Sequence, residues 1–139
     1  MTHVSQARLD IAAERARQRE AEGYSLEHDD AHVGGELALA AACYARPGAG
    51  NDPVPPADWP WEASAWKPKT RRCDLVRAAA LNDAEIERLL RLIARAADAS
   101  AQLAPGGVPS VVEQNAALIE AVTQCAPEMT RLRGVNAKI

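Results

Sequence analysis

Residues 32–45, HVGGELALAAACYA, become almost wholly apolar after Glu36. A helix that is apolar on nearly all sides lies inside a protein, so this segment predicts the central and most buried helix of the fold. Its side chains are mostly Ala and Leu, and the whole chain of 139 residues contains no Phe. We therefore expect an all-α protein in which small side chains let the helices pack closely.

Two further helices are predicted from their ends and their periodicity. Ser5 is a favourable N-cap residue and Gly23 a favourable C-terminal one, which indicates a first helix ending near Glu22. The helical period returns over residues 70–99. Asn82 and Glu85 within this stretch form a capping-box pattern, which makes a break in the helix possible near Leu81.

A fourth helix is expected towards the C-terminus. Ser110 and Glu113 form a capping-box pattern after the turn-like sequence APGGVP, and they open a helix that runs to about Cys125. The length of the chain suits one domain. Its expected parts are a main body over residues 1–99, a turn over residues 100–109, and a C-terminal helix and tail over residues 110–139.

A long irregular segment separates the second and third expected helices. Residues 46–69 hold six of the nine prolines and all three tryptophans. So many prolines exclude a continuous helix, and a flexible linker would not ordinarily carry three large aromatic side chains. We expect an ordered loop that wraps over the helices with its indoles as anchors.

Composition and charge limit the classes of partner. The formal net charge of −3 gives no overall attraction for an extended nucleic acid or an anionic membrane. The longest apolar run, residues 37–44, is too short to cross a bilayer. The three cysteines show no metal-binding spacing, which favours reduced thiols. We expect a soluble, cytoplasmic protein that forms homo-oligomers through the apolar faces of its second and last helices.

The sequence EHDDAH at residues 27–32 is a candidate site with several interpretations. On a continuous helix, His28, His32 and Glu36 would share one face and suit a divalent metal ion. Alternatively, Asp29 or Asp30 caps the second helix. In a third interpretation, both histidines and Asp30 contact a ligand. The sequence leaves these alternatives open.

A second candidate site combines basic and aromatic residues. Five basic side chains fall within residues 67–77, next to the three tryptophans. Aromatic rings stack on bases, and Arg and Lys bind phosphates, so this segment predicts a phosphate or nucleotide site. In the competing interpretation, the indoles are core anchors and the basic residues a solvated rim. The expected ligand-binding residues are Trp61, Trp66, Lys67, Lys69, Arg71, Arg72, His28, His32 and Asp30.

Several blocks occur in an order that resembles a family of short proteins carried by tailed phages and prophages. The blocks include ERARQ, EGY, EHDD, GELALAAACYA, WPW, WKPK and EIERL, and they cover about residues 14–91. The resemblance implies a phage protein that acts in the host cytoplasm. Our first hypothesis is a binding protein that captures a small phosphorylated ligand, such as a nucleotide signal of host antiviral defence. The alternative is an inhibitor of a host defence protein that uses the Trp loop as its anchor.

The segment Gly35-Glu36-Leu37-Ala38 is similar to the GEL helix of MazG-like nucleotide pyrophosphohydrolases. That resemblance implies a third function, a metal-dependent hydrolase with Mg²⁺ held by Asp29, Asp30, Glu36 and Glu85. Under the two binding hypotheses we expect neither catalysis nor a metal or other cofactor.

Overall fold

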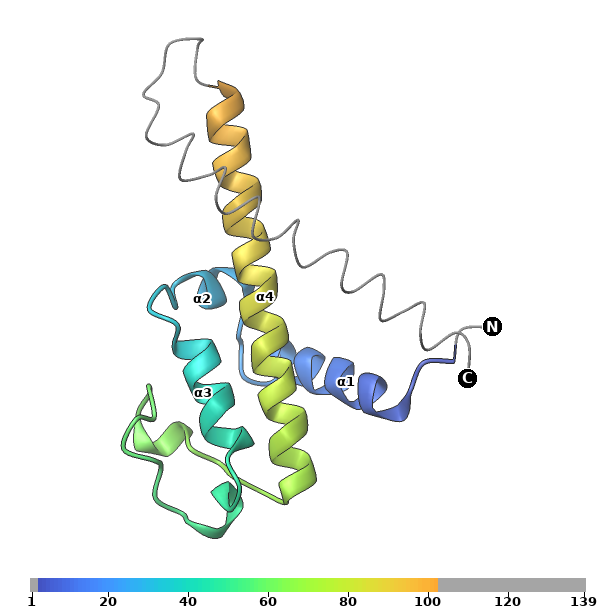
Figure 1. Cartoon of the computed structure of the whole chain (residues 1–139), viewed down its shortest axis with the longest axis vertical. Helices are drawn as coiled ribbons and strands as arrows, with labels where there is room; N and C mark the ends of the chain where they lie inside the picture. The colour runs from blue at the N-terminus through green and yellow to red at the C-terminus, as the bar shows by residue number, and fades with distance from the viewer. Residues whose placement is uncertain (1–2, 103–139) are drawn as a thin grey trace. The chain divides into compact units, whose positions relative to one another are not determined.

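The computed structural model describes residues 3–102, and this part of the chain contains four α-helices, two single-turn 3-10 helices and no strand (Figure 1). The all-α expectation is therefore confirmed. The elements in chain order are α1 (Gln6–Glu20), α2 (Leu26–Asp30), α3 (Glu36–Ala45), η1 (Ala49–Asn51), η2 (Ala63–Ala65) and α4 (Arg71–Gln102). The expected helix over residues 110–125 lies outside the described residues. Backbone contacts divide the chain after Arg88, so the site below is described within residues 3–88.

Helix α1 begins where the sequence predicted. The side chain of Ser5 accepts a hydrogen bond from the backbone N–H of Arg8, and the helix ends at Glu20, two residues before the expected end. The chain then turns at Gly23, whose φ of 70° lies in the left-handed region that favours glycine. The residues that α1 buries are polar, Arg15 and Gln18. This helix therefore joins the rest of the fold through hydrogen bonds and ion pairs.

The start of the central helix was predicted wrongly. Helix α3 begins at Glu36, not near His32, because Gly35 adopts a left-handed conformation with φ 84° and interrupts the helical path. The Glu36 carboxylate accepts a hydrogen bond of 2.9 Å from the backbone N–H of Gly34, which fixes this turn. Residues 26–30 form the separate short helix α2, whose N-cap is Ser25.

Helix α3 and the first half of α4 form the hydrophobic core. Helix α3 lies beside α4 in Figure 1, and its buried residues pack with buried residues of α4. The core comprises Leu37, Ala40, Ala41, Cys43 and Tyr44 from α3, Ala78, Leu81 and Ala84 from α4, and Trp66 from the loop. Helix α4 continues through Leu81 without the break that its capping-box pattern allowed. Of the alanines of α3, Ala40 and Ala41 are buried within this chain, whereas Ala38 and Ala42 are exposed. The expected homo-oligomer stays a prediction.

The Trp-rich segment between α3 and α4 is irregular apart from η1 and η2. Trp66 is 6% exposed, and its indole N–H donates to the backbone carbonyl of Asp52 at 3.2 Å. Close approach elsewhere in the segment requires glycine, since a Cβ at Gly50 would lie 2.4 Å from the carbonyl oxygen of Lys69. The segment thus folds back on itself over the end of α3.

Residues 89–102 continue α4 and expose several of its leucines, Leu89, Leu90 and Leu92. Among the residues that the structure describes, no helix is both long enough and apolar enough to span a membrane.

Candidate functional site

A pocket of about 410 Å³ opens between α1, α3, the Trp-rich segment and the first turns of α4. Its wall combines four aromatic rings with three basic side chains and one acid. These residues are Tyr24, Tyr44, Trp59 and Trp61, then Arg17, Lys67 and Arg77, and finally Glu22. We call this hollow the aromatic–basic pocket. In a chain of net charge −3, an excess of basic side chains around one hollow favours an anionic ligand.

The aromatic wall belongs to a continuous series of ring contacts. Tyr24 stacks on His28 with ring centroids 4.7 Å apart, and His28 meets His32 edge-on at 4.8 Å. His32 then contacts Trp61 at 5.3 Å, and Trp61 contacts Trp59 at 5.4 Å. Offset and edge-to-face contacts at such distances stabilise aromatic pairs. The two histidines therefore connect the ring of Tyr24 to that of Trp61.

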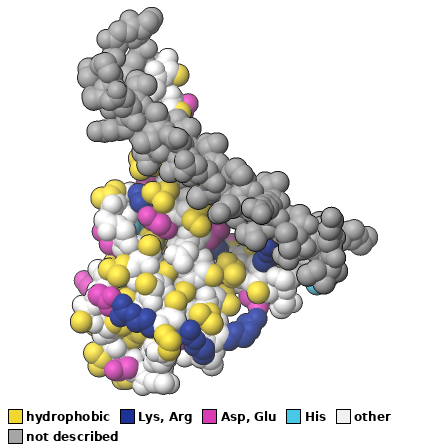
Figure 2. Space-filling model, viewed as in Figure 1, with side chains coloured by type: hydrophobic (Ala, Val, Ile, Leu, Met, Phe, Trp, Pro, Cys, Tyr) yellow, Lys and Arg dark blue, Asp and Glu magenta, His cyan; other side chains and the backbone are white. Residues whose placement is uncertain are grey.

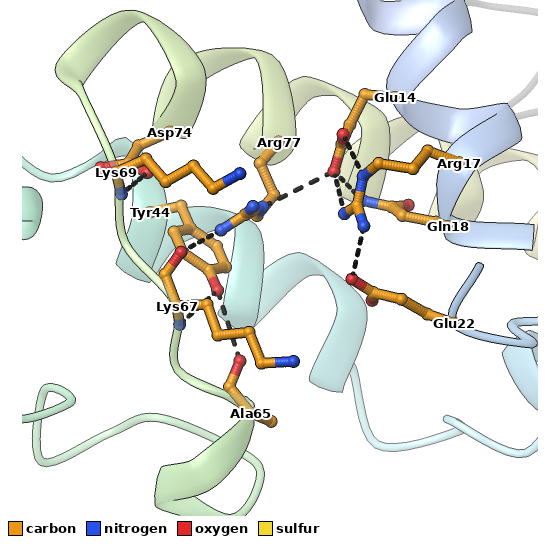
Figure 3. Close-up of polar contacts among 10 residues, drawn as sticks. All are labelled: Glu14, Arg17, Gln18, Glu22, Tyr44, Ala65, Lys67, Lys69, Asp74 and Arg77. Atoms are coloured by element: carbon orange, nitrogen blue, oxygen red, sulfur yellow. Dashed lines mark hydrogen bonds and ion pairs between the residues drawn. The ribbon is translucent and has the colours of Figure 1, made fainter.

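Tyr44 anchors the other end of the wall. Its ring stacks on Trp66 at 4.7 Å, and its hydroxyl oxygen accepts a hydrogen bond of 3.2 Å from the backbone N–H of Lys67. The same hydroxyl donates to the carbonyl of Ala65 at 3.5 Å (Figure 3). A buried side chain of α3 thus fixes the backbone from which Lys67 extends.

Arg77 lies over this arrangement. Its guanidinium carbon is 5.0 Å from the centre of the Tyr44 ring, and its Nη1 donates to the carbonyl oxygen of Lys67. Its Nε lies 3.6 Å from a carboxylate oxygen of Glu14. The cation–π contact and the ion pair hold the guanidinium at the edge of the pocket.

Arg17 supplies the third basic group, from α1. Its guanidinium donates to Glu14 at 2.7 Å and to Glu22 at 2.8 Å (Figure 3). Burial alone would raise the pKa of Glu14, but the hydrogen bond from Arg17 and the charges of Arg17 and Arg77 outweigh it and lower that pKa. Burial and the negative charge of Glu22 raise the pKa of Tyr24 to about 12, so its hydroxyl stays neutral at physiological pH.

The remaining basic side chains of the predicted site do not line the aromatic–basic pocket. Arg71 donates to the backbone carbonyl of Arg46 at 2.7 Å, and Arg72 pairs with Asp10 of α1. Lys69 lines a separate hollow near the start of α4. Figure 2 shows Lys and Arg side chains in a band across the lower part of the drawn face.

The structure places two predicted site residues in the pocket wall, Trp61 and Lys67. His28 and His32 do not line the pocket but contact two of its rings, those of Tyr24 and Trp61, and Trp66 lies in the core. Sequence reasoning missed Arg17 and Tyr24, because α1 and the turn after it reach the pocket only through the tertiary fold.

The acidic residues proposed for a metal site have other partners. Asp29 is 1% exposed and pairs with Arg15 at 2.5 Å, so it does not cap α3. Glu85 binds the guanidinium of Arg88 through two hydrogen bonds of 2.8 Å. The hydrogen bonds to Glu85 raise the pKa of Arg88 most. The negative charges of Glu85, Asp30 and Glu36 raise it further. An arginine therefore lies among the acids that the hydrolase resemblance assigns to Mg²⁺.

The histidines do not complete such a site. Residues 28–36 are not one helix, so His28, His32 and Glu36 do not share the helical face on which the metal interpretation relied. Within residues 3–102, no group of three or more His, Cys, Asp or Glu side chains is placed to hold a metal ion.

Comparisons of this chain with protein-family models, with curated proteins and with solved structures find no match. The two resemblances given under Sequence analysis receive no support from them.

Proposed function

We propose that this chain is a binding protein for a small phosphorylated ligand with a planar ring, of the nucleotide class. The observation that supports this most strongly is the aromatic–basic pocket, in which four aromatic rings and three basic groups surround one hollow of about 410 Å³. Sites for small molecules are mostly apolar or aromatic hollows of about 300–1,000 Å³ with a few polar groups. The pocket falls within this range.

Lys67 is the basic group best suited to receive a phosphate. Its side chain is exposed at the pocket, and within residues 3–102 no carboxylate lies at ion-pairing distance from its ammonium group. Its backbone is fixed by Tyr44 and by Arg77, as described above. A phosphate at Lys67 gains a charge-assisted hydrogen bond without displacing an existing ion pair.

Trp61 is suited to receive the planar ring. It is half-buried, its ring lies between those of His32 and Trp59, and it lines the pocket. In the described part of the chain, its buried indole Nε1–H has no hydrogen-bond partner. Stacking of a base on an aromatic side chain contributes about 1–3 kcal/mol.

The arrangement favours binding over hydrolysis or protein inhibition. The acids assigned to Mg²⁺ hold Arg15 and Arg88, so a metal would have to displace buried guanidinium groups. The indoles expected to anchor a partner protein pack inward, since Trp66 is buried and Trp59 and Trp61 are half-buried. The pocket that Trp59 and Trp61 line is open to a small molecule.

Isothermal titration calorimetry tests this function. The four common nucleoside monophosphates are titrated at low salt, with the free nucleosides and inorganic phosphate as partial ligands. We expect one or more monophosphates to bind more tightly than either part alone. Lys67→Gln should weaken that binding by about 1.5–3 kcal/mol, the range for a hydrogen bond to a charged group. Arg19→Gln, on the exposed side of α1, is the matched charge control and should change little. If no nucleotide, whether mono-, di- or triphosphate, binds the wild type at millimolar concentration, the proposal is wrong.

A further inference from the structure

A second hollow of about 290 Å³ adjoins the aromatic–basic pocket. Arg17 and Arg77 line both hollows, so the two share one boundary. Beyond that boundary the second hollow is lined by Lys69 and Arg72 and by the acids Asp10 and Glu14. We call it the basic hollow. It contains none of the aromatic residues that line the first.

Lys67 and Lys69 carry positive charge from one hollow into the other. They are two residues apart in a segment without regular structure, and each lines a different hollow. Figure 3 draws their side chains on either side of the Arg77 guanidinium, and each lysine shares a hollow with Arg77. The three groups therefore form a row across the boundary.

The row is held in place by hydrogen bonds to the backbone of both lysines. The carbonyl of Lys67 accepts from Arg77, and the N–H of Lys69 donates to the buried carboxylate of Asp74 at 2.8 Å. Asp74 is 1% exposed in the first turn of α4. Because these bonds fix the main chain, both lysine side chains start from fixed positions, and their flexible stems let the ammonium groups adjust to a ligand.

We propose that the ligand is a nucleotide with an extended phosphate chain, such as a di- or triphosphate. The ring and the first phosphate occupy the aromatic–basic pocket, and the distal phosphates reach Lys69 and Arg72 in the basic hollow. This inference rests on the function proposed above and adds the ligand class. A single phosphate would satisfy only the Lys67 end of the row.

The acids of the basic hollow are compatible with this ligand. Asp10 pairs with Arg72, but the pair lies at the surface, where ion pairs contribute little and exchange partners readily. Glu14 is held between Arg17 and Arg77. The negative charge of Glu14 repels phosphates. We therefore expect the phosphate chain to run along Lys67 and Lys69.

The experiment compares adenosine and guanosine monophosphates with the corresponding triphosphates by isothermal titration calorimetry without divalent ions. We expect the triphosphate to bind wild type at least about tenfold more tightly. Lys69→Gln should remove most of that advantage and leave the monophosphate Kd within about twofold, because Lys69 contacts only the distal phosphates. Arg19→Gln removes the same charge outside both hollows and should preserve the advantage.

The outcomes separate the two proposals. Equal affinity for mono- and triphosphate, or an equal loss of both in Lys69→Gln, would overturn the extended-phosphate inference and leave the monophosphate pocket standing. An equal effect of Lys69→Gln and Arg19→Gln on the triphosphate would also overturn it, since the effect would then be general charge. Absence of binding by every nucleotide would contradict the proposed function and this inference with it.

Discussion

Arg15 of α1 and Asp29 of α2 form a buried ion pair, with 2.5 Å between Nη2 and Oδ2 and side chains that are 6% and 1% exposed. The pair joins α1 to α2. It assigns Asp29 a structural role, since the carboxylate that could have capped a helix or bound a metal instead neutralises a buried guanidinium. The pocket depends on it indirectly, because α1 carries Arg17 and α2 carries His28.

Replacement of Asp29 by Asn should therefore destabilise the protein strongly. Loss of one partner from a buried ion pair leaves the other charge uncompensated, which typically costs about 3–5 kcal/mol. Asp83→Asn is the control, because Asp83 lies 3.8 Å from the same arginine but is 51% exposed. Its loss should cost about 1 kcal/mol or less. The free energy of unfolding in urea measures both, and similar values for the two variants would contradict the assignment.

The tryptophans should separate into structural and ligand-contacting residues. Trp66→Ala removes a buried ring that stacks on Tyr44 and donates to Asp52, and should cost about 3–5 kcal/mol of stability. Trp61→Leu keeps an apolar side chain at a half-buried position, so it should cost less while removing the stacking surface. Urea unfolding and nucleotide titration of both variants check this. A Trp61→Leu protein that binds nucleotide normally would exclude the indole from the site.

Stability should fall as the pH drops through the range of histidine titration. Burial lowers the pKa of His32, and the charges of His28 and Arg88 add to this against the opposing carboxylates of Glu36 and Asp29. A lowered folded-state pKa means that the unfolded chain binds the proton first. The contribution of His32 to the free energy of unfolding is therefore present above its unfolded-state pKa of 6.5. It is lost as the pH falls from 6.5 through the lower folded-state pKa.

Melting temperatures at about pH 7.5 and about pH 5 measure this effect, since the acids with lowered pKa, such as Asp10 and Glu14, titrate at lower pH. The difference between the two temperatures should shrink in His32→Gln. His3→Gln is the control, because His3 is exposed and is not among the groups that shift the pKa of His32. An unchanged difference in His32→Gln would assign the pH dependence to other groups.

Glu36 distinguishes a binding protein from a metal-dependent hydrolase. Its carboxylate accepts from the N–H of Gly34, and glutamine can make the same hydrogen bond without the charge that Mg²⁺ requires. We expect Glu36→Gln to keep nucleotide affinity within about twofold, a difference of well under 1 kcal/mol. Hydrolysis of a nucleoside triphosphate by wild type that disappears in Glu36→Gln would favour the hydrolase.

The parts of the fold that could be predicted from sequence have local causes. Ser5 caps α1 through its own neighbours, and the apolar residues after Glu36 mark α3 as the central helix. Gly35 is present in the sequence, but the sequence does not show whether a glycine adopts a left-handed conformation or continues the helix. The break before α3 could therefore not be predicted from it. The Arg15–Asp29 pair joins residues fourteen apart with no periodic signal, so it could not be anticipated.

The candidate site was predictable only in part for the same reason. Lys67 and Trp61 were identified because basic and aromatic residues are adjacent in the sequence. Arg71 and Arg72 belong to the same run, yet neither lines the aromatic–basic pocket, because the first turn of α4 brings Arg71 to the carbonyl of Arg46 and Arg72 to Asp10 beside the basic hollow. Tyr24 joins the pocket through the turn after α1, which no residue pattern in the Trp-rich segment indicates.

The most direct test of the central claim follows the three indole N–H signals in heteronuclear correlation spectra during a nucleotide titration. Trp59 and Trp61 line the pocket, whereas the Trp66 indole N–H is bound to the carbonyl of Asp52 in the core. We predict that the Trp61 signal shifts most and saturably, that the Trp59 signal shifts with it, and that the Trp66 signal stays in place. No shift at Trp61 with a nucleotide that binds by calorimetry would contradict the claim that the aromatic–basic pocket is the ligand site.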